Sequence, residues 1–315
     1  MHEHPTRTLT VVTNSGLCNH LRVLLSGLVL AEATGRYFTM FWPRTKDCAA
    51  GFAELFANPW PVREATRQEL ACLPRRPPVK HIVTDVQNTD VADIRIRAYN
   101  WLSAPVGFPA QRQLMQRCAE LLQEMQPTKE LQARVEAFQD DSFRSRMIGV
   151  HLRRGDMHLL YPASAANTLA AMAAVDTYLA QEPEAGILLC TDDGAIHQRT
   201  GRPLPSEGVQ AKFLARYGER VVFTIPRSLD RRDPAAIQDA LVDLWLLRQT
   251  DYVVGTIGSS FSGMAVLGRS VPVTLCQSQH PLRHVLPLRS WLRGERPLKW
   301  LARYYWRLIR PRGLG

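Results

Sequence analysis

The sequence lacks any long hydrophobic segment. Its longest apolar run, residues 21–31, contains Arg22, and it is well short of the ~20 apolar residues that a transmembrane helix needs. The first eight residues include Glu3 and Arg7 and have no apolar core, so we expect no secretory signal there. We therefore expect a protein of the cytoplasm.

Paired cysteine motifs are also absent. None of the six cysteines forms a C-x-x-C spacing, which disfavours both a structural zinc site and a disulfide framework. Scattered thiols fit a reducing compartment. Hydrophobic residues make up 45% of the chain and charged residues 22%, which is ordinary for a folded globular protein.

Positive charge is concentrated near the C-terminus. The formal net charge is +10, and residues 283–312 hold nine basic residues and one acid, leaving about +2 for the rest. Within this segment, residues 298–310 form a basic, aromatic and amphipathic pattern that suits the inner face of an anionic membrane. Packing of this helix across a cleft is the alternative. Nucleic-acid binding through the tail is disfavoured, because it leaves the charged pairs inside the chain unexplained.

The N-terminal half opens as strand, turn and helix. Residues 9–13 favour a strand, and residues 17–34 favour a helix that ends at Gly35. In α/β proteins such a junction lies at the carboxyl end of the sheet, where ligands bind. Further on we expect a strand at 81–86, helices at 111–125 and 128–138, and a domain boundary within 139–146.

The second half alternates between strands and helices. This alternation predicts a parallel sheet with helices on both faces. The expected strands are 147–152, 186–190, 221–225, 252–255 and 271–276. The expected helices are 167–179, 234–248 and 261–268.

A charged motif, H-L-R-R-G-D from His151 to Asp156, closes the first of these strands. Arg153 and Arg154 at a strand's carboxyl end suit phosphate binding, because a guanidinium offers a planar, bidentate fork. Asp156 can orient one of them. A surface ion pair is the alternative.

Two adjacent carboxylates, Asp192 and Asp193, follow the next strand. They suit a sugar hydroxyl or a base, and a helix N-cap with a first-turn acid is the alternative. A metal site of the D-x-D type is disfavoured because the two acids are adjacent.

Asp239 and Asp243 lie one turn apart on one helix face. Asp243 sits among apolar residues, and its carboxylate can accept two N–H groups from a guanine edge.

Two glycine-containing turns complete the pattern. Residues 255–263, G-T-I-G-S-S-F-S-G, lie between a strand and a helix, where backbone N–H groups and hydroxyls can cradle an anion. Residues 14–22, N-S-G-L-C-N-H-L-R, place a glycine at a helix start, which suits close approach to a phosphate. A tight turn and a plain capped helix are the respective alternatives.

Taken in order, these motifs resemble those of the GDP-fucose-dependent fucosyltransferase superfamily. It includes bacterial alpha-1,2-fucosyltransferases, nodulation-type and animal alpha-1,6-fucosyltransferases, and protein O-fucosyltransferases. The segment 151–156 is similar to its H-x-R-R-x-D motif, 191–193 to its T-D-D motif, and 243–262 to its third motif. The segment 16–22 resembles its N-terminal G-x-G-N helix, with Cys18 in place of a glycine.

The resemblance implies an α/β, GT-B-like fold with two Rossmann-like domains facing a cleft. Residues 1–145 would form the acceptor side, 146–282 the donor side, and 283–315 a basic amphipathic segment. It implies inverting transfer of fucose from GDP-fucose to a glycan or lipid-linked glycan, with no metal. The arginines would neutralise the charge on departing GDP.

The resemblance also implies roles for individual residues. The residues implied in catalysis are Arg154, His151, Asn19 and Asp156. Those implied in donor binding are Arg153, Arg154, Asp192, Asp193, Asp243, Ser259, Ser260 and Phe261. Of these, Asp243 would hold the guanine, and Ser259, Ser260 and Phe261 would line the phosphate cradle.

The general base stays unassigned. Residues 157–161, M-H-L-L-Y, contain no carboxylate, whereas animal alpha-1,6 enzymes place a glutamate soon after the first motif. His158, His20 and Asp156 are the candidates, since a base needs reach and a suitable pKa. Transfer from another nucleotide sugar and non-catalytic binding of a nucleotide sugar remain open as alternatives.

Overall fold

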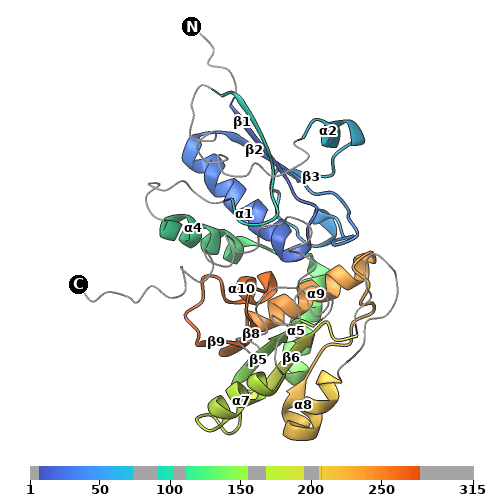
Figure 1. The fold of residues 1–315 in the computed structure, drawn as a ribbon, viewed down its shortest axis with the longest axis vertical. Helices are drawn as coiled ribbons and strands as arrows, with labels where there is room; N and C mark the ends of the chain where they lie inside the picture. Colours follow the sequence, from blue (N-terminus) through green and yellow to red (C-terminus); the bar gives the residue numbers. More distant parts are fainter. Residues whose placement is uncertain are drawn as a thin grey trace, which may run out of the picture. The chain divides into compact units, whose positions relative to one another are not determined.

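A computed structural model shows two parallel β-sheets, each with its own helices (Figure 1). It describes residues 7–73, 91–102, 111–154, 168–194, 206 and 208–276. All of them belong to one unit, residues 1–277. The expected strand at 81–86 and the basic segment 283–315 lie outside the described residues.

The first sheet has the strand order β3-β2-β1-β4, and all its pairs are parallel. Its strands are β1 (Thr8–Val12), β2 (Tyr37–Phe41), β3 (Val62–Arg63) and β4 (Asp93–Arg97). Helix α1 (Leu17–Thr34) packs against β1 and β2. It ends at Gly35, which has a φ of 59°, a conformation that glycine adopts without steric cost. The predicted helix at 17–34 is therefore confirmed.

Four more helices accompany the first sheet or follow it. Within the first sheet, η1 (Phe52–Glu54) lies between β2 and β3, and α2 (Arg67–Ala71) lies between β3 and β4. Between the two sheets the chain forms α4 (Gln111–Glu124) and α5 (Lys129–Ser142). The predicted helix at 111–125 is confirmed, and α5 runs four residues beyond its predicted end at 138. Its last turn is polar and solvent-exposed, so hydrophobic periodicity does not reveal it. The domain division at residue 146 stays a prediction.

The second sheet has the order β7-β6-β5-β8-β9, again with every pair parallel. Its strands are β5 (Met147–Leu152), β6 (Gly186–Thr191), β7 (Val221–Val222), β8 (Tyr252–Thr256) and β9 (Val273–Cys276). Its helices are α7 (Thr168–Leu179), α8 (Val209–Tyr217), η2 (Gly218–Arg220), α9 (Pro234–Leu247) and α10 (Ser260–Val266). Asp233 begins α9, because its side chain accepts the N–H of Ala235 at 2.9 Å.

Helices cover both faces of this second sheet. Leu188 and Cys190 of β6 belong to the core that includes α9, whereas Ile187 and Leu189 belong to the core that includes α7 and α8. Successive residues of a strand point to opposite faces, which explains why β5 and β6 are apolar along nearly their whole length. The predicted α/β class with a parallel sheet is thus confirmed.

Strand β7 is shorter than predicted. Only Val221 and Val222 pair with β6, instead of residues 221–225. The chain then leaves the sheet edge, because the Thr224 hydroxyl donates to the Asp243 carboxylate at 2.5 Å. A side-chain contact with α9 is therefore found where three further residues of strand were predicted.

A row of aromatic rings links the helices of the two halves. Trp42 lies 4.5 Å from His20 and 5.5 Å from Phe52, measured between ring centroids. Phe56 then lies 5.3 Å from Phe52 and 5.8 Å from Trp245 of α9. The four rings other than His20 belong to a hydrophobic core that contains residues of both sheets.

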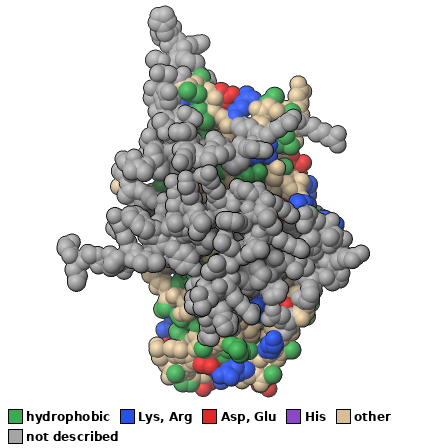
Figure 2. Space-filling view, in the orientation of Figure 1, with side chains coloured by type: hydrophobic (Ala, Val, Ile, Leu, Met, Phe, Trp, Pro, Cys, Tyr) green, Lys and Arg blue, Asp and Glu red, His purple; other side chains and the backbone are tan. Residues whose placement is uncertain are grey.

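The surface near α7 and α8 carries mixed side chains. Figure 2 shows basic, acidic and hydrophobic groups interspersed at its lower end. One ion pair, between Arg216 and Asp176 at 2.6 Å, joins these two helices. Among the described residues, no helix is long and apolar enough to cross a membrane.

Candidate functional site

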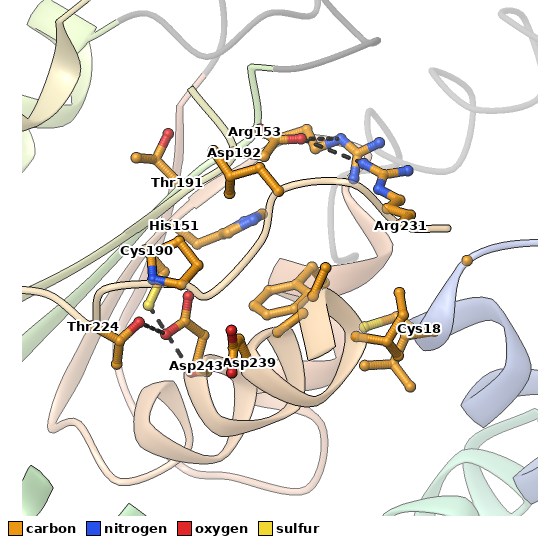
Figure 3. A pocket seen from close by; sticks show the side chains of 18 of the residues that line it. Cys18, His151, Arg153, Cys190, Thr191, Asp192, Thr224, Arg231, Asp239 and Asp243 are labelled. Carbon is orange, nitrogen blue, oxygen red and sulfur yellow. Dashed lines mark hydrogen bonds and ion pairs between the residues drawn. The ribbon is translucent and has the colours of Figure 1, made fainter. Parts of the chain in front are cut away.

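A cavity of about 310 Å³ lies at the carboxyl ends of β5 and β6 (Figure 3). Its volume is at the lower end of the range of small-molecule sites. The N-terminus of α1, the loop before α9, α9 itself and the start of α10 complete its walls. The predicted site residues that line it are His151, Arg153, Asp192, Asp193, Asp243, Ser260 and Phe261.

His151, at the end of β5, is held by α10. Its Nδ1 lies 2.7 Å from the Ser262 hydroxyl, and its ring stacks on Phe261 with centroids 4.7 Å apart. Burial lowers the pKa of His151 to about 4. The ring is therefore neutral near pH 7, so it is better suited to donate a hydrogen bond than to carry charge.

Ser262 holds the predicted site residue His151 but was not itself predicted as a site residue. Its hydroxyl oxygen accepts the N–H of Thr256 at 3.0 Å, so its own proton is available for Nδ1 of His151. A side chain on Gly255 would leave no room for this contact, because its Cβ would lie 2.9 Å from the Ser262 side chain. The turn 255–263 thus positions a side chain of the site.

Arg153 shares one carboxylate with a second arginine, Arg231. The Asp192 Oδ2 atom lies 3.3 Å from Arg153 Nε and 3.4 Å from a terminal nitrogen of Arg231. Arg153 is further fixed through its backbone N–H, which donates to the Thr256 hydroxyl at 2.9 Å. The Arg153 and Arg231 side chains are 22% and 23% exposed, so both remain accessible to a ligand.

Arg154, the second arginine of the doublet, does not line the cavity. Its guanidinium donates to the Thr168 hydroxyl on α7, and its exposed fraction is 8%. Its backbone N–H donates to Asp192 Oδ1 at 2.5 Å. The structure therefore separates the doublet, with Arg153 in the cavity wall and Arg154 behind it.

Asp193 has a largely structural environment. Its Oδ2 accepts the Ser206 hydroxyl at 2.9 Å and the Val209 N–H at 3.0 Å. The second bond satisfies a free N–H at the start of α8, although Asp193 lies 16 residues before Val209 and is not the N-cap residue that the alternative describes. Asp192 and Asp193 thus differ: one lies between arginines, and the other stabilises a helix end.

Helix α9 contributes two acids, Asp239 and Asp243, whose pKa values are shifted in opposite directions. Burial opposes ionisation of Asp239, but hydrogen bonds from Arg227 and Arg134 hold its pKa below the ordinary value. Burial raises the pKa of Asp243 to about 7, although the bond from Thr224 acts in the other direction. In the described part of the chain, no cation pairs with Asp243, and its carboxylate faces the cavity.

The N-terminal half supplies Gly16, Leu17, Cys18 and Asp47 to the wall. Asp47 belongs to a tight turn, in which the Thr45 hydroxyl accepts its backbone N–H at 3.2 Å. Burial raises the pKa of the Cys18 thiol to about 12, so this thiol stays protonated. Cys18 lies in the cavity wall, at the position where the G-x-G-N motif of the fucosyltransferase superfamily has a glycine.

Several other predicted residues lie elsewhere. Asn19 is half-buried on α1, and Ser259 precedes α10, and neither lines the cavity. His20 is fully buried against Trp42 and also lies outside the lining, which argues against it as a base. Asp156 and His158 lie outside the described residues, so their roles remain predictions. No group of three metal-binding side chains is found among the described residues.

The structure resembles solved fucosyltransferases. NodZ alpha-1,6-fucosyltransferase soaked with GDP-fucose matches with a TM-score of 0.57 at 18% identity, over 85% of this chain and 94% of that one. NodZ from Bradyrhizobium gives 0.56 at 17% identity, covering 85% and 95%. POFUT1 in complex with GDP-fucose gives 0.52 at 12% identity, covering 88% and 99%.

The chain has the fold of these fucosyltransferases. At such low identity the likeness concerns the fold alone, and it confirms the GT-B-like fold that the motifs predict. No protein-family model matches the sequence, and no curated protein does so either.

Proposed function

We propose that the protein is an inverting, metal-independent glycosyltransferase that moves fucose from GDP-fucose to a hydroxyl of a glycan or lipid-linked glycan. One observation carries this proposal. A single cavity combines a buried carboxylate, Asp243, with the guanidinium groups of Arg153 and Arg231 on another side (Figure 3). A nucleoside diphosphate has the matching chemistry, with N–H donors on the base and negative charge on the phosphates.

In this proposal Asp243 binds the guanine. A guanine edge presents two N–H donors, and an ionised carboxylate can accept both. Asp243 is suited to this because no described cation competes for its oxygens. The fold supports guanine over other bases, since the solved neighbours are described with GDP or GDP-fucose.

The arginine side of the cavity would stabilise the transition state. As the acceptor oxygen attacks the anomeric carbon, its hydroxyl proton passes to a general base, which stays unassigned. The bond from the anomeric carbon to the phosphate oxygen breaks, and GDP leaves with the electron pair. Positive groups fixed near that oxygen lower the barrier without a metal. Arg153 lies in the wall, and Arg154 supports it from behind through its N–H bond to Asp192.

The remaining predicted residues take supporting roles. Neutral His151 would donate a hydrogen bond to the sugar or its phosphate oxygen, while Ser260 and Phe261 would line the phosphate end. Residues 1–145 would face the acceptor and 146–282 the donor, in agreement with a lining drawn mostly from the second sheet and its helices. The basic segment 298–310 would bring the protein to the inner membrane face, where a lipid-linked glycan is presented.

Calorimetric titration tests the donor assignment. GDP, GDP-fucose, GDP-mannose and UDP-glucose are titrated, with EDTA present, into wild type and Arg153→Ala. We expect micromolar binding of GDP without metal, a preference for GDP-fucose over GDP-mannose, and loss of affinity in the variant. If wild type binds no guanine nucleotide, the assignment is wrong. If UDP-glucose binds best, the protein uses another nucleotide sugar.

A further inference from the structure

Two arginines from distant parts of the chain converge on one carboxylate at the cavity. Arg153 Nε and an Arg231 terminal nitrogen both lie within 3.4 Å of Asp192 Oδ2, so these nitrogens are less than about 7 Å apart. Figure 3 shows the two guanidinium groups side by side, with Asp192 against both. Since one negative group faces two positive groups, the trio has a net charge of +1.

The loop before α9 fixes the backbone at Arg231. The carbonyl of Arg231 accepts the N–H of Ala49, in the first half of the chain, at 3.1 Å. On either side, Asp230 N–H donates to the Ser228 hydroxyl at 3.2 Å, and Asp233 N–H donates to the Asp230 carbonyl at 2.8 Å. The loop therefore presents Arg231 to the cavity before any ligand binds, which limits the entropy lost on binding.

The neighbouring arginines are directed elsewhere. Arg232 pairs with Asp230 at 2.6 Å and is 45% exposed, and Arg227 pairs with the buried Asp239 at 2.8 Å. Arg154 is turned toward Thr168. Of these arginines, only Arg153 and Arg231 line the cavity.

We infer that Arg231 binds the diphosphate of the donor together with Arg153, so that the working arginine pair is Arg153 and Arg231 rather than the doublet. The inference rests on the proposed function, since it names a residue of the same donor site. Guanidinium forks bind phosphate oxygens bidentately. A diphosphate brings more negative charge than Asp192, so it can displace both arginines from their shared contact with this carboxylate.

The test compares Arg231→Ala with Arg232→Ala, its neighbour on the same loop. Calorimetry with GDP measures the whole site, and competition by inorganic pyrophosphate measures the anion site alone. We expect Arg231→Ala to weaken both affinities by about 10–100-fold, because hydrogen bonds to charged groups are strong. Arg232→Ala should stay within about twofold of wild type. Arg231→Lys keeps the charge without the fork, so it should weaken binding less than Arg231→Ala.

The outcomes separate this inference from the proposed function. If GDP binds wild type and Arg231→Ala equally well, the inference is overturned while the function stands. If wild type binds UDP but no guanine nucleotide, the proposed function fails, and the same comparison with UDP decides the inference. If no nucleotide or pyrophosphate binds, both fail. Should Arg231→Ala not fold, an unchanged GDP affinity in Arg231→Lys overturns the inference.

Discussion

His151 Nδ1 lies 2.7 Å from the Ser262 hydroxyl. Because the Ser262 oxygen already accepts the Thr256 N–H, the hydroxyl proton can point to Nδ1, which leaves the other ring nitrogen, Nε2, as a donor. A neutral histidine held in this tautomer can donate to a sugar or phosphate oxygen, and it takes no proton from the acceptor near pH 7.

Nitrogen NMR of labelled protein reads this state directly. We expect His151 to remain neutral down to about pH 5, with the proton on Nε2, because burial lowers its pKa to about 4. His20, with a pKa also lowered to about 4 by burial, should stay neutral over the same range, but with its proton on Nδ1, which lies 3.3 Å from the Gly16 carbonyl oxygen. Exposed histidines, in contrast, titrate near 6.5. A titration of His151 near pH 6.5, or a proton on Nδ1, would contradict this account.

Replacing Ser262 by alanine should affect two separate properties, the stability of the protein and the positioning of His151. The buried Thr256 N–H loses its acceptor, which costs about 1–3 kcal/mol in the free energy of unfolding. We also expect a lower transfer rate with a nearly unchanged GDP affinity, since His151 loses its tautomer preference. Urea unfolding, turnover and the histidine NMR spectrum measure the three effects. Ser142→Ala, at the exposed end of α5, is the control, and equal rates in the two variants would count against positioning.

GDP affinity should depend on pH through Asp243. Only the ionised carboxylate accepts two guanine N–H groups, and burial raises its pKa to about 7. Affinity should therefore rise about tenfold from pH 6 to pH 8. In Asp243→Asn this tenfold rise in affinity should vanish. The GDP phosphates titrate equally in both experiments, so their effect cancels when the pH dependence of the variant is subtracted from that of wild type. An equal pH dependence in both proteins would contradict guanine binding by Asp243.

The same carboxylate should lower stability at alkaline pH. A folded-state pKa of about 7, raised above the ordinary value of 3.8, means that the folded state favours protonated Asp243. The contribution of protonated Asp243 to the free energy of unfolding is complete below pH 3.8, and it is lost as pH rises through 7. Asp243→Asn should thus unfold at a higher temperature than wild type at pH 8. A lower melting temperature at that pH would argue against a buried charge.

The packing of α1 on β2 leaves no room for a side chain at Gly27. A Cβ there would lie 2.5 Å from Phe38 Cε2, so Gly27→Ala should lower the free energy of unfolding by about 1–3 kcal/mol despite the better helix propensity of alanine. Adding Phe38→Leu should restore part of this loss, as a double-mutant cycle in urea measures. Additive losses would show that the two residues are not in contact.

Much of the second sheet could be predicted because its strands are buried on both faces. Continuous apolar runs such as 147–152 and 186–190 stand out from polar loops, and the residues at their carboxyl ends then define the cavity edge. Strand β4 was missed although Asp93–Arg97 alternates strictly between charged and apolar residues. Helix α8 follows Gly208, which makes no side-chain cap bond, so its start carries no capping signal.

The individual site residues were harder to predict than the motifs. Arg227, Arg231 and Arg232 lie in one loop, and only tertiary contacts decide which of them reaches the cavity. Likewise, the sequence does not show which arginine of the doublet reaches the cavity, because the partner of Arg154 on α7 depends on the fold. The acidic residue type at Asp243 was informative, because a carboxylate among apolar neighbours needs a function or a partner.

A crystal structure of the protein with GDP tests the central claim most directly. The account predicts the guanine edge on the carboxylate of Asp243 and the diphosphate between the guanidinium groups of Arg153 and Arg231. GDP bound away from this cavity, or in it with the base and the phosphates reversed, would contradict the account.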